Sequence, residues 1–101
     1  MGYTYRLNQQ AHDEYIAAFE WYELKQDGLG ERFTDCVEKR LKQIVAHPEY
    51  YSKRQGNYRE AKVENFLYMI VYEFFKTKQL LHIAAIYHSK RNPKKKYRKL
   101  K

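Results

Sequence analysis

The sequence predicts an α+β domain in which a helical hairpin packs on one face of a mainly antiparallel, twisted sheet. Three observations support this fold class: an alternating apolar stretch near the start, two helical stretches separated by glycines, and three β-rich runs with short connections. The expected order is strand, helix, helix, strand, strand, strand. A chain of 101 residues has the size of one domain. We expect residues 1–93 to form this domain and residues 94–101 to be a basic C-terminal tail.

The first strand and the first helix are predicted from adjacent stretches. Apolar and polar side chains alternate over residues 3–7, which is the period of a half-buried strand. Asn8 is suited to cap the N-terminus of the helix that follows. Residues 9–25 then carry aromatic side chains at spacings of four and three, which predicts a helix with one apolar stripe.

The second helix follows a glycine-containing interruption. Gly28 and Gly30 end the first helix, as glycine commonly does at a helix C-terminus. The apolar residues of the next stretch fall on one helical face: Phe33, Val37, Leu41, Ile44 and Val45. Pro48 ends this helix, because the residue before a proline avoids helical angles. Two helices joined by a short turn are expected to form an antiparallel hairpin.

Three β-rich runs make up the second half. Residues 59–63 predict a short strand, residues 67–75 a long one and residues 80–87 the last, with a turn at residues 76–78. The two long runs are nearly continuous in apolar residues, which is typical of central strands with at least partial cover on both faces. The short connections favour an antiparallel meander.

Composition excludes several classes of protein. Apolar residues make up 44% of the chain and aromatic residues 17%, which is incompatible with a disordered chain. The single cysteine, Cys36, excludes an intramolecular disulfide and a cysteine-based zinc site, and it fits a reducing cytoplasm. We therefore expect a cytoplasmic protein. No stretch approaches the ~20 apolar residues of a membrane helix, so no membrane partner is expected. We find no metal-ligand spacing and no glycine-rich phosphate loop, so neither a metal nor a cofactor is expected.

Positive charge gathers at the C-terminal end. The formal net charge is +8, and residues 88–101 hold eight basic residues and no acidic one. The remaining residues, 1–87, balance twelve basic against twelve acidic side chains. A neutral body with a cationic end is suited to approach a polyanion from one side, although a solvated tail would have the same composition. The nucleic-acid-binding candidates are Lys90, Lys94, Lys95, Lys96 and Arg98.

Several stretches, taken together and in order, resemble one known family. Residues 20–23 and 28–33, with Pro48 closing the second helix, resemble the helical hairpin of the RelE/ParE toxin superfamily. Residues 58–72 are similar to the family's Arg-led strand and its aromatic-rich central strand. Residues 83–93 resemble its last strand and the His-x-x-Arg-x-Pro pattern that follows. The glycine turn and this ending are closest to the ParE-like branch.

The resemblance implies a function and a partner. It identifies the chain as the toxin of a type II toxin–antitoxin system of the plasmid-stabilisation type, held inactive in a hetero-oligomer with a cognate acidic antitoxin. Toxins of this superfamily arrest growth by cleaving messenger RNA in the ribosome or by poisoning DNA gyrase, and the resemblance leaves both targets open. A non-catalytic module that binds nucleic acid or protein on the same fold is the alternative.

If the protein cleaves RNA, particular residues are candidates for the chemistry. Metal-independent RNA cleavage needs a base for the 2′-OH, an acid for the departing oxygen and cations for the developing charge. His88, at the end of the last predicted strand, suits proton transfer, and Arg91 suits phosphate binding. Tyr97 follows Arg91 at a spacing similar to that of the Arg and Tyr of ribosome-dependent relatives. Arg59 would supply a second cation if its strand lies near the exit of the last strand.

Each of these four residues also has a structural interpretation. His88 at a strand end is commonly a hydrogen-bonding residue, and Arg91 would serve equally well to anchor the tail. Arg59 would pair with a carboxylate of this chain or of an antitoxin, and Tyr97 among lysines would be solvated. The sequence leaves the catalytic and structural interpretations open.

Overall fold

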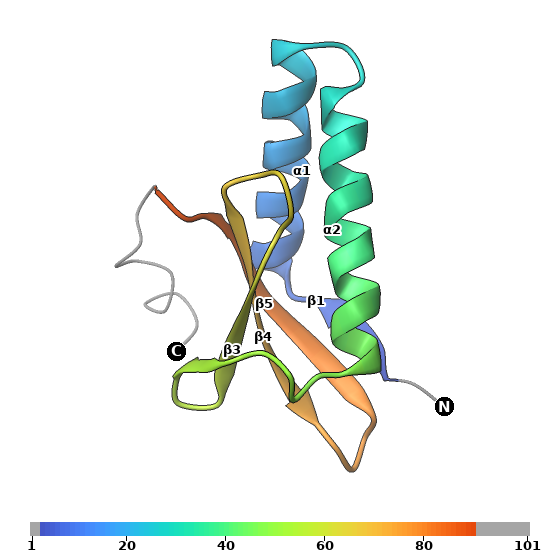
Figure 1. Ribbon diagram of the computed structural model, residues 1–101, viewed down its shortest axis with the longest axis vertical. Helices are drawn as coiled ribbons and strands as arrows, with labels where there is room; N and C mark the ends of the chain where they lie inside the picture. Colours follow the sequence, from blue (N-terminus) through green and yellow to red (C-terminus); the bar gives the residue numbers. More distant parts are fainter. Residues whose placement is uncertain (1–2, 91–101) are drawn as a thin grey trace.

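The molecule has two layers, a helical hairpin and a five-stranded sheet (Figure 1). The computed structural model describes residues 3–90. In chain order the elements are β1 (Thr4–Leu7), α1 (Gln9–Lys25), α2 (Leu29–Ala46), β2 (Lys53–Gln55), β3 (Tyr58–Lys62), β4 (Tyr68–Phe75) and β5 (Leu80–His88). The predicted α+β class, with two helices on a mainly antiparallel sheet, is confirmed.

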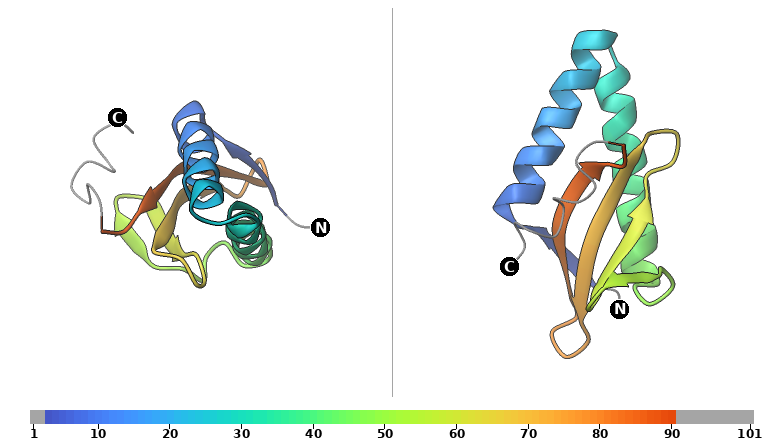
Figure 2. Two further views of the ribbon diagram at one scale, coloured as in Figure 1. Left: turned by 90° about the horizontal axis from the view of Figure 1, so that it is seen from above. Right: turned by 90° about the vertical axis from the view of Figure 1, so that its left-hand side faces the viewer.

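The strand order in the sheet is β1-β5-β4-β3-β2. Strands β3 to β5 form the predicted antiparallel meander, and β2, which was not predicted, adds a further antiparallel strand to it. Strand β1 pairs in parallel with β5. Figure 2 shows that α1 and α2 run side by side and that the strands twist relative to one another. The connections between β2, β3, β4 and β5 are short, which explains the meander. The long connection from β1 through both helices leads to β2 at the opposite edge of the sheet.

Local interactions fix the two helices where the sequence places them. The side chain of Asn8 accepts a hydrogen bond from the Ala11 N–H at 2.8 Å, which confirms it as the N-cap of α1. Gly28 has a φ of 86°, and α2 begins directly after it. Gly30 therefore lies inside α2 rather than in the turn. The Glu23 carboxylate accepts from the Gly28 and Gly30 N–H groups at 2.9 and 3.0 Å, so a side chain of α1 caps the start of α2.

The core lies between the hairpin and one face of the sheet. The predicted α2 stripe is confirmed, since Phe33, Val37, Leu41 and Ile44 are fully buried and belong to the same cluster as Ile70, Tyr72 and Ile83 of the sheet. A second, smaller cluster lies on the other face of the sheet. It consists of Val71, Ala84 and Ala85, with Tyr58 and Tyr87 packed against them. The expectation that the central strands are partly covered on both faces is thus confirmed.

Two features of the sheet are not predictable from local patterns. Strand β2 has three exposed polar residues, so it lacks the alternation that marks a half-buried strand. The pairing of β5 with β4 shifts between Val71 and Tyr72, which leaves Ala84 as an extra residue in β5.

Within the described residues, no helix combines the length and apolar character that crossing a membrane requires.

Candidate functional site

His88 lies at the end of β5, on the face of the sheet that the helices cover. It is the cross-strand neighbour of Tyr68, and the two rings meet edge to face with centroids 5.3 Å apart. Tyr68 in turn packs against Phe33, with ring centroids 5.0 Å apart. The Ser89 N–H donates to the Leu67 carbonyl at 2.7 Å and fixes the exit of the strand. The half-buried imidazole is therefore attached to the aromatic core.

The hydrogen bond at the imidazole of His88 limits its chemistry. The backbone N–H of Lys90 donates to Nδ1 at 3.1 Å. Since Nδ1 accepts a hydrogen bond here, the neutral ring assigned from this bond carries its own hydrogen on Nε2. This tautomer presents a donor at Nε2, and protonation of Nδ1 would break the bond to Lys90. In this arrangement the neutral ring accepts at Nδ1 and donates at Nε2.

Arg59 lies on the same face of the sheet but holds a loop in place. Its guanidinium donates to the carbonyl oxygens of Tyr51 and Glu49 at 2.6 and 3.2 Å, and its carbon centre lies 5.3 Å from the centre of the Phe74 ring. Its Nε is buried and has no hydrogen-bond partner among the described residues. The side chain therefore joins β3 to the segment between α2 and β2, and its guanidinium is directed into the protein.

The structure does not bring Arg59 and His88 together. Arg59 pairs with Tyr72 of β4, whereas His88 pairs with Tyr68 of the same strand, four residues away and on its other side. At ~3.3 Å per residue and ~4.8 Å between strands, this places their Cα atoms roughly 16 Å apart. Fully buried Ile70 lies between Tyr68 and Tyr72 along β4, facing the helices. Arg59 therefore lies four residues along β4 from the pair that ends β5, and the catalytic role predicted for it stays a prediction.

The other face of the sheet carries carboxylates. Glu60 is only 8% exposed and accepts a hydrogen bond from the Tyr87 hydroxyl at 3.0 Å. Glu73 faces the imidazole of His82, with 3.2 Å between Oε2 and Nδ1. Burial and the charge of Glu73 raise the pKa of Tyr58 above its ordinary value. Two carboxylates on this face disfavour the approach of a phosphate backbone.

Several predicted site residues lie beyond the part of the chain that the structure describes. These residues are Arg91, Lys94, Lys95, Lys96, Tyr97 and Arg98. Lys90 is the last described residue, and its side chain is exposed directly after the exit of β5. The predicted boundary at residue 93 also lies outside the described range. The site that can be described thus consists of His88, Lys90 and their neighbours at the end of β5.

Comparison with protein families decides the relationship of the chain. The profile of a family described as "ParE toxin of type II toxin-antitoxin system, parDE" matches residues 5–93. The chain belongs to the ParE toxin family. The resemblance seen in the hairpin, the central strand and the His-x-x-Arg-x-Pro ending therefore reflects membership of this family.

Solved structures show the same fold as this ParE-family toxin. It is similar to a chain of the chromosomal ParDE system from P. aeruginosa, with a TM-score of 0.71, 10% identity, and 85% of this chain and 95% of that chain covered. The isolated E. coli RelE toxin gives a TM-score of 0.64 at 14% identity, with 98% and 99% covered. A chain of the intact E. coli RelBE complex gives 0.62 at 15% identity, with 83% and 93% covered. No curated protein sequence matches the chain significantly.

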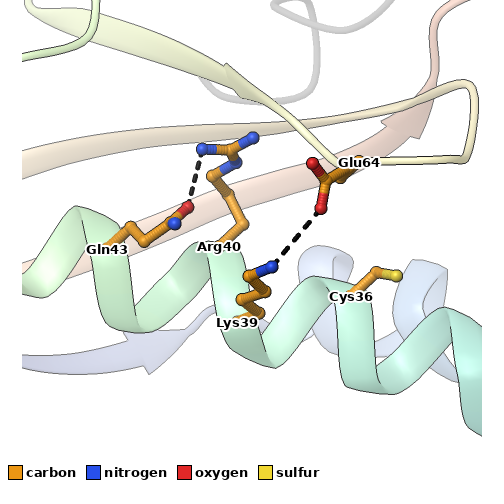
Figure 3. A pocket seen from close by; sticks show the side chains of 5 residues that line it. All are labelled: Cys36, Lys39, Arg40, Gln43 and Glu64. Carbon is orange, nitrogen blue, oxygen red and sulfur yellow. Dashed lines mark hydrogen bonds and ion pairs between the residues drawn. The ribbon is translucent and has the colours of Figure 1, made fainter.

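A shallow pocket of the ParE-family toxin lies beside α2 and the residues that follow β3 (Figure 3). It is lined by Cys36, Lys39, Arg40, Gln43 and Glu64. Its cations are already used within the protein, because Lys39 pairs with Glu64 at 3.5 Å and Arg40 donates to Gln43 at 2.7 Å. Among residues 3–90, no group of three or more His, Cys, Asp and Glu side chains could hold a metal ion. The pocket therefore offers less chemistry than the end of β5.

Two carboxylates that hold the elements together are not predictable from the sequence. Glu14 of α1 accepts the Ile86 N–H of β5 at 2.9 Å, two residues before His88. Glu38 of α2 accepts from the hydroxyls of Tyr5 and Tyr15 at 3.0 and 2.9 Å, which connects β1, α1 and α2. Neither contact has a local signal, because the partners are 72, 33 and 23 residues apart in sequence.

Proposed function

We propose that this ParE-family toxin arrests growth by binding and poisoning DNA gyrase, without cleaving RNA. The observation that supports this function is the position of Arg59. Its guanidinium is hydrogen-bonded to two backbone carbonyls, and the buried core separates it from His88. Among the described residues, the Arg59 cation and the His88 imidazole are therefore not held at one site.

The state of His88 supports the same reading. A general base in RNA cleavage needs an unprotonated nitrogen directed at the 2′-OH. In this chain the unprotonated nitrogen, Nδ1, accepts the Lys90 N–H, and the ring packs against Tyr68. A toxin that acts by binding needs a stable surface rather than a titrating group, and a histidine fixed by its neighbours provides part of such a surface.

Ribosome-dependent cleavage of mRNA is the second candidate function. It is favoured by the position of His88 at the strand exit, followed at once by exposed Lys90 and the basic residues beyond it. In this reading His88, Arg91 and Tyr97 perform the chemistry, with Arg59 as a more distant cation. The ribosome would then have to rearrange the end of β5, because the bond between His88 and Lys90 occupies Nδ1.

The partner that we propose is an acidic antitoxin in a hetero-oligomer. Two of the similar structures are a ParDE system and a RelBE toxin–antitoxin complex. The net charge of +8 and the eight basic residues in the last fourteen favour a partner of opposite charge. Lys90, Lys94, Lys95, Lys96 and Arg98 would contact this antitoxin in the inactive complex and a nucleic acid in the free toxin.

Purified components distinguish gyrase poisoning from cleavage. We expect the toxin to inhibit supercoiling of relaxed plasmid by gyrase at concentrations that leave ribosome-bound mRNA uncut. His88→Ala should inhibit supercoiling within about twofold of the parent protein, whereas loss of a general acid or base would lower cleavage by about 10² or more. The matched control is His47→Ala, since His47 is exposed at the end of α2. Cut mRNA with normal supercoiling would contradict the proposal.

A further inference from the structure

One end of the sheet gathers positive charge. Residues 50–59 and 74–81 hold five of the twelve basic side chains of residues 1–87 and none of the twelve acidic ones. The connection from α2 to β2, the turn between β2 and β3 and the turn between β4 and β5 all lie at this end, away from the turn between the helices (Figure 1, Figure 2). We call residues 49–58 and 75–79 the turn end. Clustered charge of one sign makes it a candidate contact for a polyanion.

Three cations of the turn end are available to a ligand. Lys53 and Arg54 lie exposed on the edge strand β2, and Lys78 lies exposed in the turn between β4 and β5. Within the described part of the chain, none of the three takes part in an ion pair. Lys76 does, since its ammonium lies 3.3 Å from the Glu49 carboxylate. This pair joins the β4–β5 turn to the segment after α2, so the two basic segments lie on one surface.

An exposed aromatic ring lies beside these cations. Tyr50 follows Glu49 directly and precedes Lys53 by three residues, and its side chain is 80% exposed. The ring of Tyr51 meets it at 87°, with centroids 5.0 Å apart. Burial in this fold therefore does not account for Tyr50, whereas a planar ligand stacked on its ring would cover it.

The backbone that carries Tyr50 is fixed from the sheet. The Tyr72 hydroxyl and the Arg59 guanidinium donate to backbone carbonyls on both sides of Tyr50, at 2.6 to 3.2 Å. The Arg59 guanidinium is thereby used within the protein, but it holds the segment in place. Because the ring stands on a fixed backbone, stacking a ligand on it costs little ordering entropy.

We propose that the turn end binds a single-stranded nucleic acid. Tyr50 would stack on a base, while Lys53, Arg54 and Lys78 would contact phosphates. A single strand fits better than a duplex, because its bases are free to stack on a side chain. The proposal goes beyond the gyrase proposal and does not depend on it, since the turn end lies at the opposite end of β4 and β5 from His88.

Fluorescence anisotropy of a labelled strand of about twelve nucleotides measures this binding. We expect the strand to bind at least about tenfold more tightly than a duplex of the same sequence to a parent protein with an intact ring. The strand is supplied as RNA and as DNA, and the ratio of the two affinities identifies which of them is the ligand.

Substitutions of Tyr50 test the stacking contact. Tyr50→Ala should weaken binding of the strand by about fivefold or more, which is the loss that removing one base–aromatic stack produces. Tyr50→Phe keeps the ring and should bind within about twofold of the parent protein. The matched control is Trp21→Ala, because Trp21 is an aromatic side chain that is 48% exposed on α1. It should bind the strand as the parent protein does.

Two triple variants test the phosphate contacts. Each replaces three exposed cations with glutamine, on the turn end in the first variant and on the helices in the second: Lys53, Arg54 and Lys78, against Lys25, Lys39 and Lys42. The first should lower the salt slope of strand binding by about 2, since each phosphate contact contributes ~0.7, and the second should leave it nearly unchanged. The basic residues after residue 90 are the same in both variants, so their contribution cancels.

Three results would overturn the proposal. The first is a Tyr50→Ala variant that binds the strand as tightly as the parent protein. The second is an equal salt slope for the two triple variants. The third is displacement of the strand by a polyglutamate peptide of the same charge at equal concentration, which would make an acidic protein segment the occupant instead. Thermal denaturation of each variant checks that the fold is retained.

Discussion

Gly30 of α2 lies close against the backbone of α1. A Cβ atom at this position would meet the Phe19 carbonyl oxygen at 2.7 Å and the Glu23 carboxylate at 2.9 Å. In an open helix Gly→Ala stabilises by up to ~1 kcal/mol, whereas overpacking costs ~1–3 kcal/mol. The contact with backbone should dominate, so we expect Gly30→Ala to lower the free energy of unfolding by about 1 kcal/mol or more. Urea denaturation measures this difference.

Gly28 provides the control for this prediction. It has a φ of 86°, and nothing would lie within 4 Å of an added Cβ. Asparagine tolerates the left-handed region, so Gly28→Asn should cost less than about 1 kcal/mol. A Gly30→Ala variant that is more stable than the parent protein would show that the helices are further apart than described.

Glu38 and Tyr15 predict how stability depends on alkaline pH. Burial, followed by the hydrogen bond to Glu38, raises the pKa of Tyr15 well above its ordinary value of 10. Above pH ~10 the unfolded chain ionises this hydroxyl and the folded chain does not, so its stabilising contribution is lost as pH rises. Above pH ~10.5 the free energy of unfolding should therefore fall with pH more steeply in the parent protein than in Tyr15→Phe, by about 1.4 kcal/mol per pH unit. Identical slopes in urea titrations would contradict the assignment.

Single residues are predictable when their partners are close in the chain. Asn8 is identified as an N-cap because it contacts Ala11, three residues away. The partners of Glu14 and Glu38 are remote, and their positions depend on packing that no local pattern records. For the same reason the sequence places Arg59 on a strand but does not show that its guanidinium binds the carbonyls of Glu49 and Tyr51.

At the scale of elements, the segment that connects α2 to β2 is fixed by hydrogen bonds from side chains of the sheet. The buried hydroxyl of Tyr72 donates to the Pro48 carbonyl at 2.6 Å, and Arg59 binds the next part of the same segment. Because hydrogen bonds from a charged group contribute ~1.5–3 kcal/mol, Arg59→Ala should lower the free energy of unfolding by about 2 kcal/mol. Hydrogen exchange of residues 47–52 should become faster in the same variant.

Arg54 is the matched control for this element. It lies exposed in β2, and Arg54→Ala should change the free energy of unfolding by less than about 0.5 kcal/mol. If Arg59→Ala were as stable as the parent protein and yet lost its toxicity, Arg59 would act directly on the target. The structural role described for it would then be wrong.

Elements with strong periodicity are predictable, and edge strands are not. The long strands β4 and β5 follow from their apolar patterns to within one residue at each end, and the helices also follow from theirs, except that α2 begins before Gly30. The short strand β2 lacks such a pattern because all of its side chains are exposed. The parallel pairing of β1 with β5 joins segments about 75 residues apart, and only tertiary packing specifies it.

At the scale of the whole molecule, charge is unevenly distributed along the sequence. Residues 20–35 carry an excess of carboxylates, whereas the later part of the chain is basic. If the proposed nucleic-acid contacts are correct, replacing Lys94, Lys95 and Lys96 with glutamine should lower the salt slope of single-stranded RNA binding by about 2, since each phosphate contact contributes ~0.7. Replacing Lys25, Lys39 and Lys42 removes equal charge from the helices and should leave the slope nearly unchanged. Equal slopes for both triple variants would contradict the proposed contacts.

The fold of the molecule is more predictable than its site. Hydrophobic periodicity predicts the two layers, because the spacing of apolar residues in each helix or strand indicates which face is buried. The predicted site depends on where distant strands meet, and the register of β4 with both neighbours places Arg59 and His88 apart. The sequence predicts both residues as candidates but cannot supply that register.

Growth arrest by a His88→Ala variant is the most direct test of a toxin that acts by binding. The variant is expressed without antitoxin, with RNA ends and plasmid supercoiling followed in the same cells and the fold checked by thermal denaturation. We predict arrest as strong as that of the parent protein, with relaxed plasmid and uncut messages. A folded His88→Ala variant that permits growth, beside a parent protein that cuts messages, would contradict the account.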